Sequence, residues 1–187
     1  KLKKITDLSI SLILLFILFI PFLIISLIIK IESKGPIFYI SKRVGQNKKL
    51  FNMIKFRTML VNTPQVNTND LRDANKFITR VGRVLRKFSI DELPQILNVI
   101  IGDISIVGPR PALINQYDLI RKREDLKINT LKPGITGLAQ INGRDKIDLE
   151  KKIYYDLKYK NKISFLFDLK ILAKTLFVVL KGQDIRH

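Results

Sequence analysis

The sequence predicts an α+β fold, with an apolar membrane helix in residues 1–34 and one compact domain of mixed helices and strands in residues 35–187. The first observation behind this prediction is an apolar run without any charged residue at positions 8–29. The second is the alternation of short helical and β-type patterns after the run. The third is length, because the residues that follow the run suffice for one domain with a hydrophobic core.

The apolar run, LSISLILLFILFIPFLIISLII, covers 22 residues from Leu8 to Ile29. A straight helix of this length spans roughly 33 Å, enough to cross a hydrocarbon core of about 30 Å. The following residues, KIESKGPIF, lack the small side chains of a signal-peptide cleavage site, so a cleaved signal peptide fits poorly. The chain begins with Lys1 rather than Met, and we expect it to be a trimmed or truncated product.

Pro21 lies inside the apolar run, where it cannot donate a hydrogen bond to the carbonyl of Ile17, so we expect a kink. Lysines flank the run on both sides, and the positive-inside rule favours the cytoplasmic side for both flanks. A helix that breaks at Pro21 and enters and leaves the membrane through one face satisfies both observations. A kinked single span is equally compatible with these residues, since membrane helices tolerate proline.

The sequence pattern in the first part of the domain predicts a hairpin and a helix. Residues 36–59 have the pattern of a β-hairpin around the turn GQNKK. Residues 74–88 predict a helix with two faces. Its apolar stripe consists of Phe77, Val81, Val84 and Phe88, and its basic stripe consists of Lys76, Arg80, Arg83 and Lys87.

Four segments follow. Residues 104–107 predict a short strand, and residues 132–144 a glycine-rich loop or strand. Residues 148–160 predict a helix whose apolar side carries Leu149, Ile153 and Leu157. Residues 164–182 predict a last helix, almost wholly apolar, with three lysines on one side: Lys170, Lys174 and Lys181. A core helix is the general expectation for this pattern, and an amphipathic helix in the membrane interface is its rival.

The amino-acid composition limits which partners and which catalytic groups this chain can have. The chain has 34 Lys and Arg against 16 Asp and Glu, a net charge of +18, which predicts a polyanionic partner: nucleic acid, an anionic membrane surface or a phosphorylated substrate. It has no cysteine, which excludes disulfides and thiolate sites and suits a reducing compartment. Its one histidine is the last residue, so we expect no histidine base and no multi-histidine metal site. The chemistry therefore falls to carboxylates, Lys, Arg, Tyr or hydroxyls.

Two acids, Asp91 and Glu92, stand between a basic run and Pro94. Ser89 and Glu92 have the spacing of a capping box. A cap at Asp91 would instead place Pro94 where its missing N–H removes no helical hydrogen bond. Since the capping box is a common helix-start signal, the residues alone favour capping over catalysis for this pair.

Arg110 lies between two prolines in GPRP. The stiff backbone reduces the freedom that its guanidinium loses on binding an anion, and the fixed fork of donors suits phosphate. A surface turn is the ordinary alternative. The segment PGITG offers backbone N–H groups to a phosphate, but it lacks Walker or dinucleotide spacing.

Three motifs occur in order behind the basic-flanked apolar helix: KFRTM at 55–59, SIDELPQILNVIIGDISIVGPRP at 89–111 and KPGITGLAQINGR at 132–144. With them the sequence resembles the bacterial sugar transferases of the monotopic phosphoglycosyl transferase superfamily, over nearly the whole chain. It is similar to the minimal members, which have one membrane segment and the catalytic domain. The combination of DELPQ with GDISIVGPRP is the specific part of the resemblance.

The resemblance implies an enzyme at the cytoplasmic face of the bacterial inner membrane. Such an enzyme moves a phosphosugar from a nucleotide diphosphate sugar, with UDP as the expected carrier, to undecaprenyl phosphate and releases UMP. This is the first membrane step in making a glycoconjugate such as lipopolysaccharide, capsule or exopolysaccharide. The resemblance also implies a re-entrant helix broken at Pro21, which decides between the two topologies above in favour of re-entry.

The resemblance assigns roles to residues. Asp91 would be the nucleophile that forms a covalent phosphosugar intermediate, with Mg²⁺ bound near it, and Glu92 would assist the incoming lipid phosphate. Further functional positions match Lys55, Arg110 and Asp156, and Arg86 is added for its proximity. Asp156 has an ordinary alternative as an ion pair with Lys152 or Lys160, one turn away.

Elementary chemistry agrees with these roles, because phosphoryl transfer needs positioning and charge neutralisation and a carboxylate nucleophile needs no histidine. The rival function is a membrane-tethered, non-catalytic binder of nucleic acid or anionic lipid, which the net charge and the basic stripe favour. That rival gives no reason for two acids beside GPRP, so we expect nucleotide sugar, polyprenyl phosphate and membrane lipids as partners, and no nucleic acid. A single-pass scaffold for a protein partner is a third reading.

Overall fold

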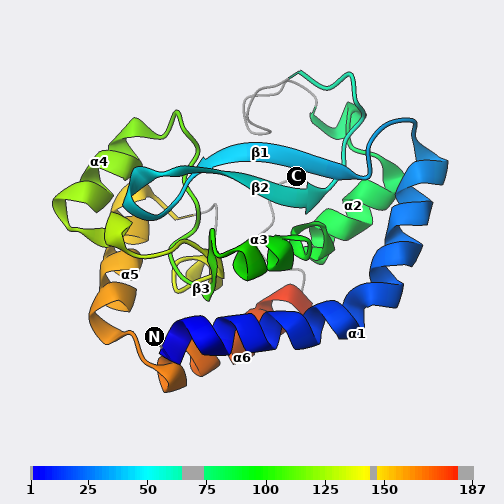
Figure 1. The fold of residues 1–187 in the computed structure, drawn as a ribbon. Helices are drawn as coiled ribbons and strands as arrows, with labels where there is room; N and C mark the ends of the chain where they lie inside the picture. Colours follow the sequence, from blue (N-terminus) through cyan, green and yellow to red (C-terminus); the bar gives the residue numbers. More distant parts are fainter. Residues whose placement is uncertain (1, 65–73, 144–146, 181–187) are drawn as a thin grey trace.

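The computed structural model describes residues 2–64, 74–143 and 147–180. It combines one long helix, an antiparallel hairpin, a parallel pair of short strands and several shorter helices (Figure 1). The predicted mixed α+β chain with a long apolar N-terminal helix is confirmed. Lys181 and Arg144, which belong to predicted segments, lie outside the described residues.

Helix α1 (Leu2–Glu32) is long and apolar enough to cross a membrane by length and composition. Most of its large apolar side chains are exposed, and Ser11 and Ile29 are its buried residues. Figure 1 shows α1 running along the lower edge of the domain and then bending upward along its side. Pro21 lies within this helix, and proline is a usual cause of such a bend.

Strands β1 (Phe38–Val44) and β2 (Leu50–Phe56) form the predicted hairpin, in antiparallel register from Val44↔Leu50 to Phe38↔Phe56. Its turn contains a short 3₁₀ segment, η1 (Gln46–Lys48). Helix α3 (Gln95–Ile101) is bonded to β2 through Asn98. The Asn98 amide accepts from the Ile54 N–H at 3.0 Å and donates to the Asn52 carbonyl at 2.8 Å.

Helix α2 (Arg80–Lys87) begins six residues later than predicted, and the first residues of the expected helix form only a 3₁₀ turn, η3 (Ala74–Lys76). The reason is that Ile78 forms an isolated β-bridge with Met59 and Thr79 caps the helix by accepting from the Gly82 N–H. The predicted apolar stripe is also wrong in part. Leu85 is buried, whereas Val84 is 52% exposed.

The centre of the domain holds a parallel pair, β3 (Ser105–Val107) and β4 (Gly134–Thr136). The predicted strand at 104–107 is therefore confirmed. A Cβ atom added to Gly134 would lie 2.1 Å from the backbone nitrogen of Gly108, so only glycine permits this close pairing. The Gly134 N–H donates to the Pro109 carbonyl at 2.9 Å, so the glycines of PGITG serve packing here rather than a phosphate loop.

Helices α4 (Tyr117–Asp125) and α5 (Leu149–Lys162) pack against each other and against the 3₁₀ turn η5 (Ile128–Thr130). A further 3₁₀ turn, η6 (Gln140–Asn142), precedes α5 in the chain. The predicted apolar side of α5 is confirmed, because Leu149, Ile153 and Leu157 pack in one cluster with Leu119 of α4. Helix α4 itself was not predicted.

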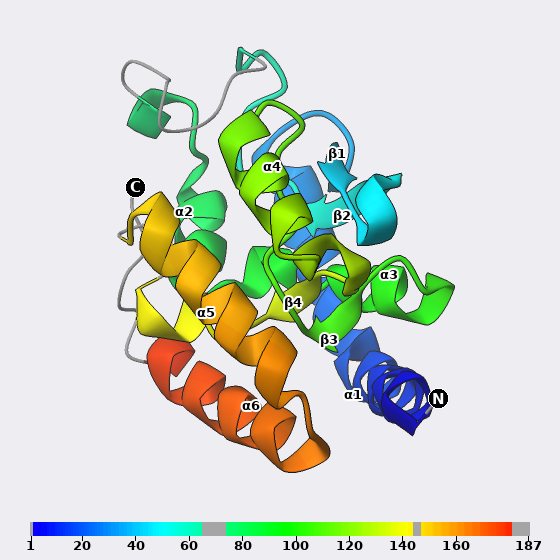
Figure 2. The ribbon, with the colours of Figure 1, turned by 90° about the vertical axis from the view of Figure 1, so that its left-hand side faces the viewer.

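Helix α6 (Phe165–Leu180) runs beside α5 (Figure 2), and the rings of Tyr159 and Phe167 stack between them. Ile171 is the buried residue of α6. Six large apolar side chains are exposed: Phe165, Leu166, Leu169, Leu176, Phe177 and Leu180. The expectation of a core helix is therefore confirmed for one face only, since Ile171, Phe167 and Leu172 pack in the main core cluster while the other face is exposed.

Candidate active site

The two acids lie in a tight turn between α2 and α3. Ser89 has a left-handed backbone (φ 54°) and makes no side-chain cap, because an N-cap residue needs an extended backbone. Asp91 and Glu92 belong to a short 3₁₀ segment, η4 (Ile90–Glu92), and α3 begins after Pro94 without a side-chain cap. The capping prediction is therefore wrong for Ser89 and for Asp91.

Glu92 is buried and is bonded to two of the predicted cations. Its Oε1 accepts from Lys55 Nζ at 2.8 Å and from Arg110 Nη2 at 3.1 Å. Lys55 comes from β2, and Arg110 comes from the loop after β3. Three separate segments therefore meet at one carboxylate, which fixes the distance between the two cations.

Asp91 is half-buried beside this cluster. Among the described residues, none donates a hydrogen bond to its carboxylate or forms an ion pair with it. Burial is the largest influence on its pKa and raises it above the ordinary value, while Lys55, Arg86 and Arg110 oppose this rise and the charge of Glu92 adds to it. The structure thus brings Arg86, from the last turn of α2, into the electrostatic surroundings of Asp91.

Arg43 of β1 also belongs to this region and was missed by sequence reasoning. Its pKa is lowered to about 10, first by burial and then by the positive charge of Arg110, while Tyr39 and Glu92 act in the opposite direction. The hairpin pattern contains the signal that finds it, because strand alternation places Arg43 on the same face as Lys55 once the register is known.

Asp156 lies behind the site rather than in it. It is 1% exposed, and its Oδ2 accepts from Arg123 Nε at 3.0 Å and from Arg123 Nη2 at 2.7 Å. Arg123 Nη1 donates to the Arg110 carbonyl at 2.9 Å. The alternative pairing is wrong, because the ion-pair partner of Asp156 is Arg123 rather than Lys152 or Lys160. Sequence reasoning missed Arg123 because it lies on α4, a helix that the sequence patterns did not predict.

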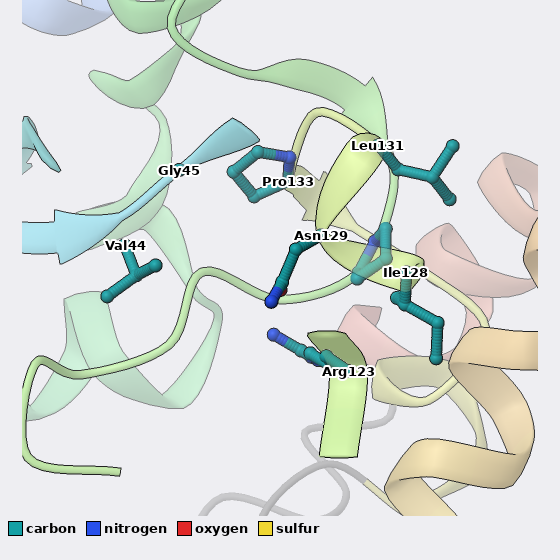
Figure 3. A pocket seen from close by; sticks show the side chains of 8 residues that line it. Val44, Gly45, Arg123, Ile128, Asn129, Leu131 and Pro133 are labelled. Atoms are coloured by element: carbon teal, nitrogen blue, oxygen red, sulfur yellow. The ribbon is translucent and has the colours of Figure 1, made fainter. Parts of the chain in front are cut away.

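A small pocket opens beside Arg123. Figure 3 shows the Arg123 and Asn129 side chains turned into it, beside Gly45 and Pro133. It is lined by Val44, Gly45, Pro109, Arg123, Ile128, Asn129, Leu131 and Pro133. Neither Asp91 nor Glu92 lines it, so the pocket is not the place where the carboxylates act.

The donor set fits Mg²⁺ held by one or two carboxylates together with phosphate oxygens. The described residues contain no group of three or more His, Cys, Asp or Glu side chains that would form an all-protein cage. Glu92 is bonded to cations, whereas Asp91 has a carboxylate open to a ligand. Asp91 is therefore the residue suited to hold such an ion.

Both ends of α1 are bonded to the same domain. Near its start, Lys3 pairs with Asp168 of α6, and Asp7 accepts from the Ser105 hydroxyl at 2.6 Å. Beyond its end, Arg57 donates to the Ser33 carbonyl at 2.7 Å and to the Lys34 carbonyl at 2.9 Å. The helix is therefore held to one domain near both of its ends, and Ile10, Phe22 and Ile25 pack against that domain between them.

Carboxylates among cations, next to an apolar helix of membrane length, are features expected of a membrane-associated enzyme that handles phosphate groups. The chain belongs to the bacterial sugar transferase family, whose model matches residues 1–182. The predicted family is thus confirmed, and with it the prediction of a phosphoglycosyl transferase enzyme.

Three relatives illustrate the range of the family. The chain is 40% identical over 186 residues to an uncharacterized sugar transferase, EpsL, of Bacillus subtilis (strain 168), covering 100% of this chain and 91% of the relative. It is 38% identical to the UDP-glucose:undecaprenyl-phosphate glucose-1-phosphate transferase of Klebsiella pneumoniae, covering 94% and 39%. It is 37% identical to the UDP-N-acetylgalactosamine-undecaprenyl-phosphate N-acetylgalactosaminephosphotransferase of Aeromonas hydrophila, covering 90% and 41%. The chain therefore spans less than half of these last two proteins.

Proposed function

We propose that this protein transfers a sugar phosphate from a UDP-sugar to undecaprenyl phosphate and releases UMP, through a covalent phosphosugar–Asp91 intermediate. The names of the two longer relatives support both the lipid acceptor and a UDP-linked donor. They name different sugars, so the choice of sugar stays open. The observation that carries the proposal is the Asp91 carboxylate, half-buried among cations and without a hydrogen bond from any described residue.

In the first step, an Asp91 oxygen attacks the phosphorus that bears the sugar, and the bond from this phosphorus to the oxygen of UMP breaks. In the second step, an oxygen of the lipid phosphate attacks the same phosphorus, and Asp91 leaves as a carboxylate. Lys55 and Arg110 would neutralise the phosphate oxygens in both steps, because phosphoryl transfer depends on positioning and charge stabilisation. Mg²⁺ held by Asp91 and the phosphates would add positive charge at the same place.

Glu92 would hold Lys55 and Arg110 at the spacing that the phosphate needs. Its predicted help to the incoming lipid phosphate belongs to the same proposal, since it lies next to Asp91 in the turn. Asp156 would act one step further away, by fixing Arg123 and through it the backbone of Arg110.

The re-entrant topology is also part of the proposal. A helix whose start pairs with Asp168 and whose end is held by Arg57 has both ends at one compact domain, which a straight span across the membrane does not allow. The exposed apolar sides of α1 and α6 would then lie in one leaflet, on the cytoplasmic face of the inner membrane.

The test is the covalent intermediate. Wild-type protein incubated with a UDP-sugar labelled in the sugar, without lipid acceptor, should release UMP in an amount matching the enzyme and retain label after denaturation. Asp91→Asn should retain none and lose turnover by at least about a thousandfold, as expected for loss of a nucleophile. Asp118→Asn, which removes an exposed carboxylate on α4, is the control.

Asp91→Asn with near wild-type labelling and turnover would refute the assignment. A panel of UDP-sugars that gives no UMP with wild-type protein, together with salt-dependent binding of nucleic acid, would instead favour the non-catalytic alternative.

A further inference from the structure

We propose that Arg43 is an additional phosphate-binding residue, which completes with Arg110 a pair of guanidinium groups around one substrate phosphate. This inference rests on the proposed function, because it assigns a ligand to the same site. It starts from a cation that neither the sequence motifs nor the contacts of Glu92 account for.

The hairpin register brings Arg43 to the site. Residues that face one another across an antiparallel pair share a face, and the pairs Tyr39↔Lys55 and Arg43↔Phe51 place both cations on one side of the hairpin. Lys42, one residue earlier, points to the opposite face and is exposed. The two neighbouring cations therefore occupy different environments.

A second link places Arg43 close to Arg110. The N–H of Val44 donates to the Ala112 carbonyl at 3.0 Å, and these two residues form an isolated antiparallel bridge. The end of β1 is thereby joined to the loop that carries Arg110. The electrostatic influence of Arg110 on the Arg43 guanidinium agrees with this placement.

Arg43 lacks a direct ion pair among the described residues, and Glu92 acts on it only through its charge. Its hydrogen bond runs from Nε to the Ser41 hydroxyl at 3.4 Å, a long distance, and among the described residues no carboxylate lies within ion-pair distance of it. Glu92 is already bonded to Lys55 and Arg110. A half-buried guanidinium that faces another cation costs free energy unless an anion binds there.

The charge of the cluster indicates which anion. Four cations, Arg43, Lys55, Arg86 and Arg110, exceed the two carboxylates Asp91 and Glu92 by two positive charges. Two guanidinium forks side by side match the geometry of phosphate oxygens. The phosphate belongs either to the diphosphate of the donor or to the lipid acceptor, and kinetics separate these sources.

The experiment compares Arg43→Gln with Lys42→Gln, which removes the same charge from the opposite face of the same strand. Turnover of a UDP-sugar and thermal stabilisation by Mg²⁺-pyrophosphate are both measured on the purified full chain. Arg43→Gln should lose kcat/KM by about tenfold to a hundredfold, the range for hydrogen bonds to charged groups, and should lose most of the pyrophosphate-induced rise in Tm. Lys42→Gln should stay within about twofold of wild type, as for an exposed charge.

Two further readouts separate binding from a structural role. Without ligand, the Tm of Arg43→Gln should equal or exceed that of wild type, because the change removes repulsion from Arg110. Arg43→Lys should recover only part of kcat/KM, because it restores the charge without the fork. A lower ligand-free Tm in Arg43→Gln, with pyrophosphate binding unchanged, would overturn the proposal.

The KM values assign the phosphate. A rise in the KM for the UDP-sugar supports the donor diphosphate, and a rise confined to undecaprenyl phosphate supports the acceptor. If Arg43→Gln and Lys42→Gln match in turnover and pyrophosphate binding, Arg43 binds no phosphate. If wild type turns over no donor, yet pyrophosphate stabilises it and not Arg43→Gln, the proposed function fails while the phosphate site stands.

Discussion

The buried ion pair between Asp156 and Arg123 gives the sharpest prediction about how the site is supported. Replacing Asp156 with Leu removes the acceptor of two hydrogen bonds, at 3.0 and 2.7 Å, and leaves the Arg123 guanidinium buried without a counterion. Arg123 keeps its bond to the Arg110 carbonyl but loses the two bonds to Asp156 that hold the other side of its guanidinium. We expect a loss of stability and a loss of activity with different origins.

The magnitude follows from burial. Asp156 is 1% exposed and Arg123 6%, so solvent does little to screen the unpaired charge. Breaking a buried pair by removing one partner costs about 3–5 kcal/mol. At about 2–4 °C per kcal/mol for a domain of this size, Asp156→Leu should lower the Tm by about 6–20 °C. Glu150→Gln, which breaks the exposed pair with Lys122, should cost less than about 1 kcal/mol.

The assay measures thermal unfolding and UMP release in parallel. It compares Asp156→Leu, Glu150→Gln and the double variant Arg123→Met/Asp156→Leu. The double variant should recover most of the lost stability, because an apolar pair can replace a buried ion pair at little cost. Its activity should remain low, because the bond that Arg123 makes to the Arg110 carbonyl is absent.

Two results would refute this reasoning. If Asp156→Leu lowers the Tm no more than Glu150→Gln, the pair does not support the domain. If the double variant regains full activity together with stability, Arg123 does not position Arg110, and Asp156 acts on stability alone.

Four further predictions address the proposed chemistry and topology. EDTA should stop UMP release and Mg²⁺ should restore it, whereas full activity in EDTA would contradict a carboxylate-bound Mg²⁺. Arg110→Lys should lower kcat/KM by about tenfold or more with an unchanged fold, because Lys lacks the bidentate fork, and wild-type kinetics would return Arg110 to a surface turn. In a chain without native cysteine, Lys3→Cys should resist an impermeant thiol reagent in intact cells, and labelling from outside would show a spanning helix. Pro21→Leu should straighten α1 and lower activity with Asp91 and Glu92 intact.

Sequence patterns predicted the parts of the fold that depend on local periodicity. The hairpin, the strand at 104–107 and the apolar side of α5 came from alternation and helical spacing, and all three are present. The predicted start of α2 was wrong because a tertiary contact, the bridge from Ile78 to Met59, overrides local helix propensity. For α6 the pattern left two environments open, because an almost wholly apolar helix does not reveal which of its faces is buried in the core.

The site shows the same division between local and tertiary information. The sequence motifs identified four residues of the candidate site: Lys55, Asp91, Glu92 and Arg110. The structure brings them together through contacts between separate segments. Local rules misread the acidic turn, because the left-handed backbone of Ser89 is not visible in a capping-box pattern. Arg43 and Arg123 were missed for another reason. Their roles depend on strand register and on a helix that pairs with α5, and neither follows from local spacing.

The attachment of the apolar helix and the construction of the site use the same two segments. Lys55 of β2 bonds to Glu92, and Arg57, two residues later, holds the end of α1. Ser105 of β3 bonds to Asp7 near the start of α1, and the chain that leaves β3 carries Arg110 to the same Glu92. Each end of the apolar helix is therefore fixed by a segment that also supplies a cation bonded to Glu92. The seating of α1 and the spacing of these two cations therefore depend on the same two segments of the domain.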